Sequence, residues 1–109
     1  MDAEASGATV SATILWSKLA QRDRIIARTS LANFNLNAAL AFENAVRRSV
    51  NMLRTFPSIG RPGHIPNTRE LVSHKRYRMI YRLMENEVLI MKLHNVSRPW
   101  PPKNHHFHD

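Results

Sequence analysis

The chain has 109 residues, 43% of them hydrophobic, which is the size and composition of one globular domain. It contains no cysteine, so disulfides, thiolate zinc sites and a cysteine nucleophile are excluded. Sixteen Lys and Arg residues against eight Asp and Glu residues leave a formal net charge of +8. This excess predicts anionic partners such as nucleic acid or an acidic protein. The alternative is a soluble protein that is basic for no functional reason.

The sequence predicts neither a membrane span nor an N-terminal signal peptide. The longest strongly apolar run, Val88–Met91, is far shorter than the roughly 20 residues that span a bilayer. Residues 1–9 have no basic or apolar region and are predicted to form a disordered leader, not a signal peptide. Residues 103–109 are predicted to form a flexible, histidine-rich tail. Adjacent histidines on such a tail rarely make a preorganised metal site, so we expect no metal and no other cofactor. A single domain over residues 10–102 of a cytoplasmic protein is the expectation.

The first half of that domain predicts a strand and two helices. Residues 10–16 alternate in polarity and are rich in Thr, Val, Ile and Leu, as a strand is. Helical periodicity then runs over residues 17–30, with Ser17 as the candidate N-cap. A second helix, with a clearer apolar stripe, extends from about residue 37 to residue 56. Two helices joined by a few residues predict an antiparallel hairpin.

The second half predicts a loop followed by strands. Residues 57–68 contain three prolines and two glycines, which is typical of a loop. Beyond them the periodicity changes to two, over residues 69–73, 77–84 and 87–96. Short polar breaks between these runs predict antiparallel strands joined by tight turns. The whole order predicts an α+β fold, with an N-terminal strand and a two-helix antiparallel hairpin packed on one face of a small antiparallel β-sheet.

Arginines of the second half are candidates for binding an anionic partner. Arg78 and Arg82 share one face of the 77–84 strand, and guanidinium groups bind phosphate oxygens well. Trp100 offers a surface on which a base could stack. The candidate binding residues are Arg69, Arg78, Arg82, Arg98 and Trp100. The alternative is a solvated sheet face whose charges discourage aggregation.

Three residues of this region are candidates for catalysis, namely Arg78, His94 and Arg98. A histidine crowded by arginines has a lowered pKa and can act as a general base. The alternative is a half-buried structural histidine. A Gly-rich phosphate loop, a His-Glu-x-x-His pair and paired carboxylates are all missing from the sequence, so metal-dependent hydrolysis is poorly supported.

Segments spread over most of the chain resemble the ParE/RelE superfamily of toxins from bacterial type II toxin–antitoxin modules. They are residues 56–63, 68–72, 77–82, 88–94 and 98–101. The resemblance implies a helical hairpin against an antiparallel sheet, and a cognate antitoxin of the ParD or RelB type. Such an antitoxin would cover the basic surface with an acidic, partly disordered segment.

The antitoxin is expected to bind the groove between the hairpin and the sheet. A domain this small cannot cover its whole apolar stripe, so an amphipathic partner helix would bury the remainder. The expected contact residues are Arg22, Arg28, Phe42, Arg47 and Arg48. The alternative for Phe42 is a place in the protein's own core.

The resemblance leaves the target of the toxin divided between two branches. RelE-type members cleave mRNA on the ribosome, whereas ParE-type members typically poison DNA gyrase. Arg78 and Arg98 match two arginines of the RelE type, but the tyrosine that follows the second one is replaced here by Pro99-Trp100-Pro101-Pro102. His94, Arg98 and the Trp-Pro ending resemble the ParE type, which favours gyrase inhibition. A metal-independent endoribonuclease, with His94 or a tail histidine carrying protons, is the runner-up, and a binding module that has lost its toxicity is the third reading.

Overall fold

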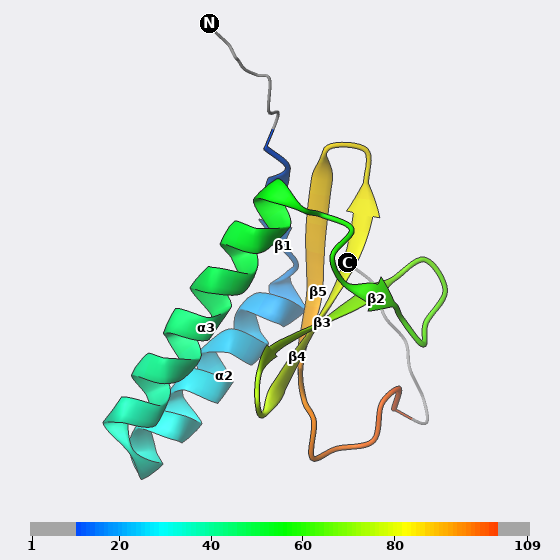
Figure 1. The fold of residues 1–109 in the computed structure, drawn as a ribbon. Coiled ribbons are helices and arrows are strands. Elements are labelled where there is room, and N and C mark those ends of the chain that lie inside the picture. The colour runs from blue at the N-terminus through cyan, green and yellow to red at the C-terminus, as the bar shows by residue number, and fades with distance from the viewer. Residues whose placement is uncertain (1–10, 103–109) are drawn as a thin grey trace, which may run out of the picture.

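The computed structural model describes residues 11–102, which form a five-stranded sheet with two helices lying together on one side of it (Figure 1). The elements in chain order are β1 (Thr13–Trp16), α2 (Lys18–Phe34), α3 (Leu36–Thr55), β2 (Arg61–Pro62), β3 (Arg69–His74), β4 (Tyr77–Met84) and β5 (Glu87–Asn95). The predicted α+β class and helical hairpin are confirmed. The predicted leader and histidine-rich tail lie outside the described residues.

The sheet is mixed, so the prediction of an antiparallel sheet is wrong for its first strand. The strand order is β1-β5-β4-β3-β2. β1 pairs with β5 in parallel, from Thr13 opposite Glu87 to Trp16 opposite Ile90. Parallel neighbours need a long crossover connection, and the helices supply part of that connection between β1 and the rest of the sheet. Only the strands that follow the loop are joined by the short turns from which antiparallel pairing could be predicted.

Two polar residues set the ends of the helices. Ser17 is the predicted N-cap of α2: its Oγ accepts a hydrogen bond from Ala20 N and donates one to Met91 O in β5, both at 3.0 Å. Asn35 alone separates the helices. Its backbone N–H donates to Leu31 O at the end of α2, while its Oδ1 accepts from Asn37 N at the start of α3. The hairpin is therefore tighter than the sequence suggested, and α2 continues to Phe34.

The core lies between the helices and one face of the sheet. Tyr77, Met79 and Tyr81 of β4 point to the helices, as their alternation predicted. Phe42 of α3 is fully buried among them, with its ring 5.0 Å from that of Tyr77. The expectation that Phe42 contacts a partner is therefore wrong, because its ring is buried in the protein's own core. Phe56, at the end of the same stripe, is exposed.

The loop after α3 is fastened to the sheet by two side chains. The hydroxyl of Tyr81 donates to Pro57 O at 2.7 Å and accepts from Gly60 N at 2.9 Å. A side chain on Gly60 would place its Cβ 2.7 Å from that hydroxyl, so only glycine fits there. Arg69, predicted to bind an anionic partner, donates from Nη1 to Ser58 O and Gly60 O at 3.2 and 2.6 Å. Its guanidinium therefore helps to fix the loop.

Replacing Tyr81 by Phe should lower the free energy of unfolding by about 1–3 kcal/mol, because Gly60 N–H would be left buried without its acceptor. Chemical denaturation measures this. Tyr77→Phe is the matched control, since the Tyr77 hydroxyl makes no hydrogen bond with any described residue. Equal losses of stability in the two variants would contradict the role assigned to the Tyr81 hydroxyl.

Candidate functional site

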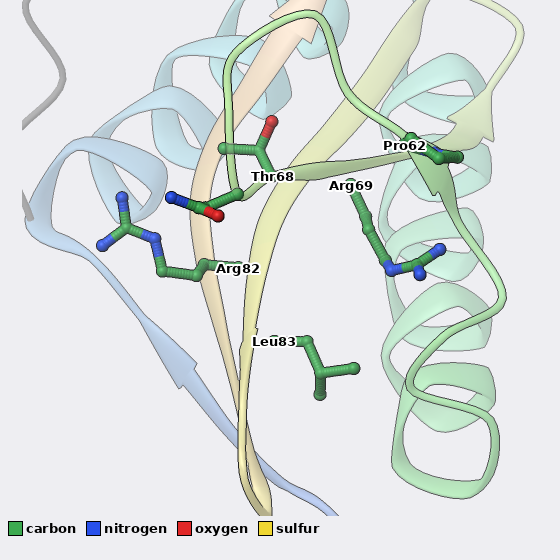
Figure 2. A pocket seen from close by; sticks show the side chains of 6 residues that line it. Pro62, Thr68, Arg69, Arg82 and Leu83 are labelled. Atoms are coloured by element: carbon green, nitrogen blue, oxygen red, sulfur yellow. The ribbon is translucent and has the colours of Figure 1, made fainter.

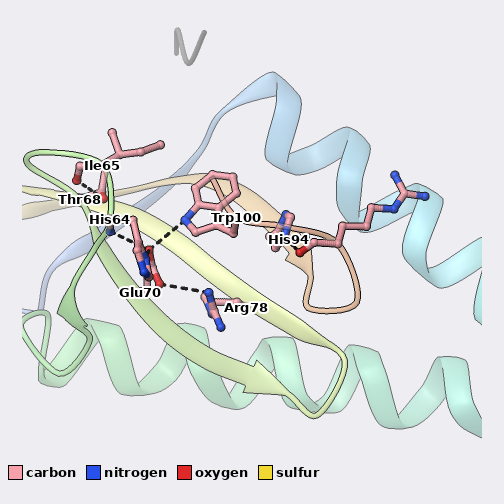
Figure 3. A network of polar contacts seen from close by, with 8 residues as sticks. His64, Ile65, Thr68, Glu70, Arg78, His94 and Trp100 are labelled. Atoms are coloured by element: carbon pink, nitrogen blue, oxygen red, sulfur yellow. Dashed lines mark hydrogen bonds and ion pairs between the residues drawn. The ribbon is translucent and has the colours of Figure 1, made fainter. Parts of the chain in front are cut away.

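The face of the sheet opposite to the helices, called here the far face, carries most of the predicted site residues. It presents Glu70 from β3, Arg78 and Arg82 from β4, and His94 from β5. Strand pairing places Arg78 directly opposite His94. The C-terminal segment that follows β5 returns across this face and brings Trp100 onto it (Figure 3).

Glu70 is the centre of a polar network on the far face (Figure 3). The residue is only 3% exposed. Its Oε2 accepts from His64 N at 3.0 Å and from Trp100 Nε1 at 2.9 Å, and lies 3.0 Å from His64 Nδ1. Its Oε1 lies 3.4 Å from Arg78 Nη1. One carboxylate thus joins the loop before β3, strand β4 and the C-terminal segment.

The donors around Glu70 keep it ionised. Burial by itself raises the pKa of this carboxyl group. The hydrogen bonds from His64 and Trp100 outweigh that effect and bring the pKa below its ordinary value. The network is therefore formed by a carboxylate at neutral pH, and its hydrogen bonds are of the stronger, charge-assisted kind.

His94 is held between Trp100 and the turn after β5. It is 5% exposed, and its ring centroid lies 4.8 Å from that of Trp100. Nε2 lies 2.9 Å from Arg98 O, so the neutral ring donates from Nε2 to this carbonyl. Burial lowers the pKa of His94, and the charges of Lys92, Arg78 and Arg98 lower it further. Arg78 and Arg98 are therefore both close to one histidine, as the sequence suggested.

Arg98 lies between two cavities that share Lys92 and His94. The smaller has a volume of 180 Å³ and lies beside α2, where Lys92 Nζ is 3.3 Å from Asp23 Oδ2. The larger has a volume of 540 Å³. Its described lining residues are Lys92, His94, Arg98, Pro99, Pro101 and Pro102. No acidic side chain is among them.

Arg82 lines a different cavity, near the β2 end of the sheet (Figure 2). That cavity has a volume of 690 Å³ and is also lined by Arg69. The two arginines extend away from each other in Figure 2. The predicted anion-binding residues thus fall into two groups, with Arg78, Arg98 and Trp100 around His94, and Arg69 and Arg82 elsewhere.

The arginines predicted to steer an antitoxin lie on the helices. Arg22, Arg47 and Arg48 are exposed. Arg28 lies 3.6 Å from Glu43, which also receives two hydrogen bonds from Arg24, at 2.7 and 3.1 Å. These contacts, the bond from Arg24 foremost, lower the pKa of Glu43. One carboxylate thus balances part of a larger cluster of guanidinium groups on the hairpin.

The family model described as "ParE toxin of type II toxin-antitoxin system, parDE" matches residues 14–100. The chain belongs to this family. Among solved structures, "Chromosomal ParDE TA system from P. aeruginosa" superposes with a TM-score of 0.70 at 18% identity, covering 80% of this chain and 98% of that one. At that identity the likeness shows the fold alone. A search of the curated proteins finds no match.

In this member of the ParE family, the far face places Arg78 opposite His94 and beside the buried carboxylate of Glu70. Both tyrosines of the chain, Tyr77 and Tyr81, lie in the core on the helix side of the sheet. Within residues 11–102 no group of three or more His, Asp or Glu side chains could hold a metal ion. No helix in the described part of the chain is long and apolar enough to cross a membrane.

Sequence reasoning did not identify Glu70 as a site residue, although a signal was present. Glu70 is the only acidic residue between Glu43 and Glu85, in a stretch that is rich in arginine. An acidic residue that is buried in a strand needs hydrogen-bond donors around it. Its partners His64 and Trp100 could not be found from spacing, because they lie 6 and 30 residues away in irregular segments.

The imidazole of His94 should titrate below the ordinary histidine pKa. Because the folded protein binds this proton more weakly than the unfolded chain, His94 should lower stability as the pH falls below that ordinary value. Arg78→Met removes one nearby positive charge and should raise the pKa of His94. NMR titration of the imidazole signals measures this, with Arg47→Met on α3 as the control. A downward shift, or the same shift in both variants, would contradict the stated electrostatics.

Proposed function

We propose that this chain is the toxin of a type II toxin–antitoxin module that inhibits DNA gyrase and so blocks replication. One observation carries the choice of gyrase over mRNA cleavage. Cations gather on the far face, but the hydroxyl of neither tyrosine is available there for proton transfer. A metal-independent nuclease needs an acid and a base as well as cations beside the scissile phosphate.

The endoribonuclease alternative depends on His94, and the contacts of that residue weigh against it. Its Nε2 is already bonded to Arg98 O and its ring is covered by Trp100. Arg78, the arginine that would hold the scissile phosphate, is paired with Glu70. Both residues are thus engaged within the protein, which weighs against their acting on a scissile phosphate.

We propose that the cognate antitoxin binds the helical hairpin. Exposed arginines and exposed apolar side chains occur together there, which suits an acidic amphipathic segment. The exposed large apolar residues of the two helices are Leu19, Ile25, Ile26, Phe34, Leu36, Leu40 and Met52. They take the place of Phe42 in this proposal. We also propose that the protein acts in the cytoplasm, where its proposed target and antitoxin would be.

Arg78→Ala and Arg98→Ala should each reduce toxicity about tenfold or more, the equivalent of about 1.4 kcal/mol in target binding. Arg61→Ala, at an exposed position of β2, is the matched control. Growth inhibition in cells and gyrase supercoiling with purified protein measure the effect. Full toxicity in the Arg78→Ala, Arg98→Ala double variant would move the active surface elsewhere. Codon-phased mRNA cuts preceding any DNA-damage response would overturn the gyrase proposal.

Association with the antitoxin should slow as salt is raised from low to physiological concentration, because exposed charges are screened. The Arg47→Ala, Arg48→Ala double variant should bind more slowly and show a weaker dependence on salt. Stopped-flow kinetics measure both. The Lys75→Ala, Arg76→Ala pair, in the turn between β3 and β4, removes the same charge away from the helices. A rate indifferent to salt, or an equal effect of both pairs, would contradict docking on the hairpin.

A further inference from the structure

The C-terminal segment over residues 96–102 has few backbone contacts to hold it. Its first part is fixed by hydrogen bonds from Val96 N to Arg76 O at 2.9 Å and from Arg98 N to Asn95 O at 3.0 Å. Three of the next four residues, 99–102, are prolines and have no backbone N–H to donate. Side-chain contacts therefore contribute to the path of the segment beyond Arg98.

The side chain of Trp100 attaches the segment to the sheet. Its Nε1 donates to Glu70 at 2.9 Å, and its ring lies against His94. Glu70 is a firm anchor because it belongs to β3, is buried, and is also bonded to His64 and to Arg78. The indole of Trp100 is thus bonded to a carboxylate, that of Glu70, whose position is fixed by its other contacts.

The held segment forms one wall of the 540 Å³ cavity described above. Prolines make that wall flat and apolar, while Lys92, His94 and Arg98 line the rest. Among the described residues that line the cavity, Lys92 is paired with Asp23 and burial lowers the pKa of His94, so Arg98 is the cation that no described acidic side chain balances. A cleft with about one positive charge and apolar walls suits one carboxylate beside apolar side chains better than a run of phosphates.

We propose that Glu70 is a positioning residue, which holds Trp100 so that the C-terminal segment and Arg98 form a cleft for an acidic side chain of a protein target. This deepens the proposed function and rests on it for the identity of the target. Glu70 itself does not touch the ligand. Its effect passes through the indole of Trp100 to the wall of prolines.

The first test follows the indole N–H signal of Trp100 by NMR, with that of Trp16 as an internal reference. Glu70→Gln should shift the Trp100 signal toward that of an indole bonded to solvent and leave the Trp16 signal in place. Glu87→Gln removes the same charge at an exposed position and should shift neither signal. An unchanged Trp100 signal in Glu70→Gln would overturn the proposal.

The second test measures binding to the cleft without the natural target. The probe is the blocked peptide acetyl-Leu-Glu-Leu-amide, followed through the amide signals of Lys92 and Arg98. The matched peptide with Gln in place of Glu, and inorganic phosphate, are the other arms. We expect the Glu peptide to bind the wild type most tightly, and Glu70→Gln to weaken it about fivefold or more. Tighter binding of phosphate than of the Glu peptide would indicate a nucleic acid ligand and overturn the proposal, as would equal binding of the two peptides.

If the Glu70→Gln variant does not fold, the Trp100→Phe variant tests the same proposal. Phenylalanine preserves an aromatic ring beside His94 but has no N–H to donate to Glu70, so peptide binding should weaken as in Glu70→Gln. Toxicity separates this proposal from the preceding one. If the wild-type protein does not inhibit gyrase, the proposed target is rejected. The peptide-binding result then decides whether the cleft binds an acidic side chain. A Glu70→Gln variant that folds and is as toxic as Glu87→Gln rejects the positioning role.

Discussion

A buried carboxylate must find donors to replace the water it has lost, and on the far face this requirement falls on Glu70. Its donors come from three separate parts of the chain, which are the loop before β3, strand β4 and the segment after β5. Trp100 lies on the sheet because its indole N–H completes this set. The surroundings of His94 follow in turn, since Trp100 covers the ring and the turn after β5 brings Arg98 to its Nε2.

Local patterns were enough to predict the elements of this fold except β2, which lies within residues 57–68 that were predicted to form a loop. The hairpin follows from two apolar stripes separated by asparagines, and the strands after the loop follow from period-two runs with short polar breaks. The parallel pairing of β1 could not be predicted in this way, because no turn fixes the neighbour of a strand that is followed by helices. Phe42 was ambiguous for a related reason: a stripe position is the same in sequence whether it meets the protein's own sheet or a partner.

The structure brings together some of the candidate site residues and separates others. Arg78 and Arg98 come close to His94 as expected, since one strand pairing and one turn relate all three. Arg69 and Arg82 do not join them. Arg69 faces the helix side of the sheet, where it holds the loop after α3, and Arg82 lies near the opposite end of β4. The charge of a residue and its place in the alternation of a strand do not show whether an arginine binds backbone carbonyls or is available to bind an anion.

The positions of the acidic residues determine how the net charge of +8 is distributed over the protein. Asp23 joins α2 to β5 through Lys92 and Leu93 N, Glu43 joins α3 to α2 through Arg24, and Glu70 joins three segments of the far face. Each of these three carboxylates forms a contact between different elements of the fold. Exposed cations such as Arg22, Arg47 and Arg48 on the helices shape the potential of the surface. Folding itself therefore separates the charges, and an acidic antitoxin would complement what the protein's own carboxylates leave unbalanced.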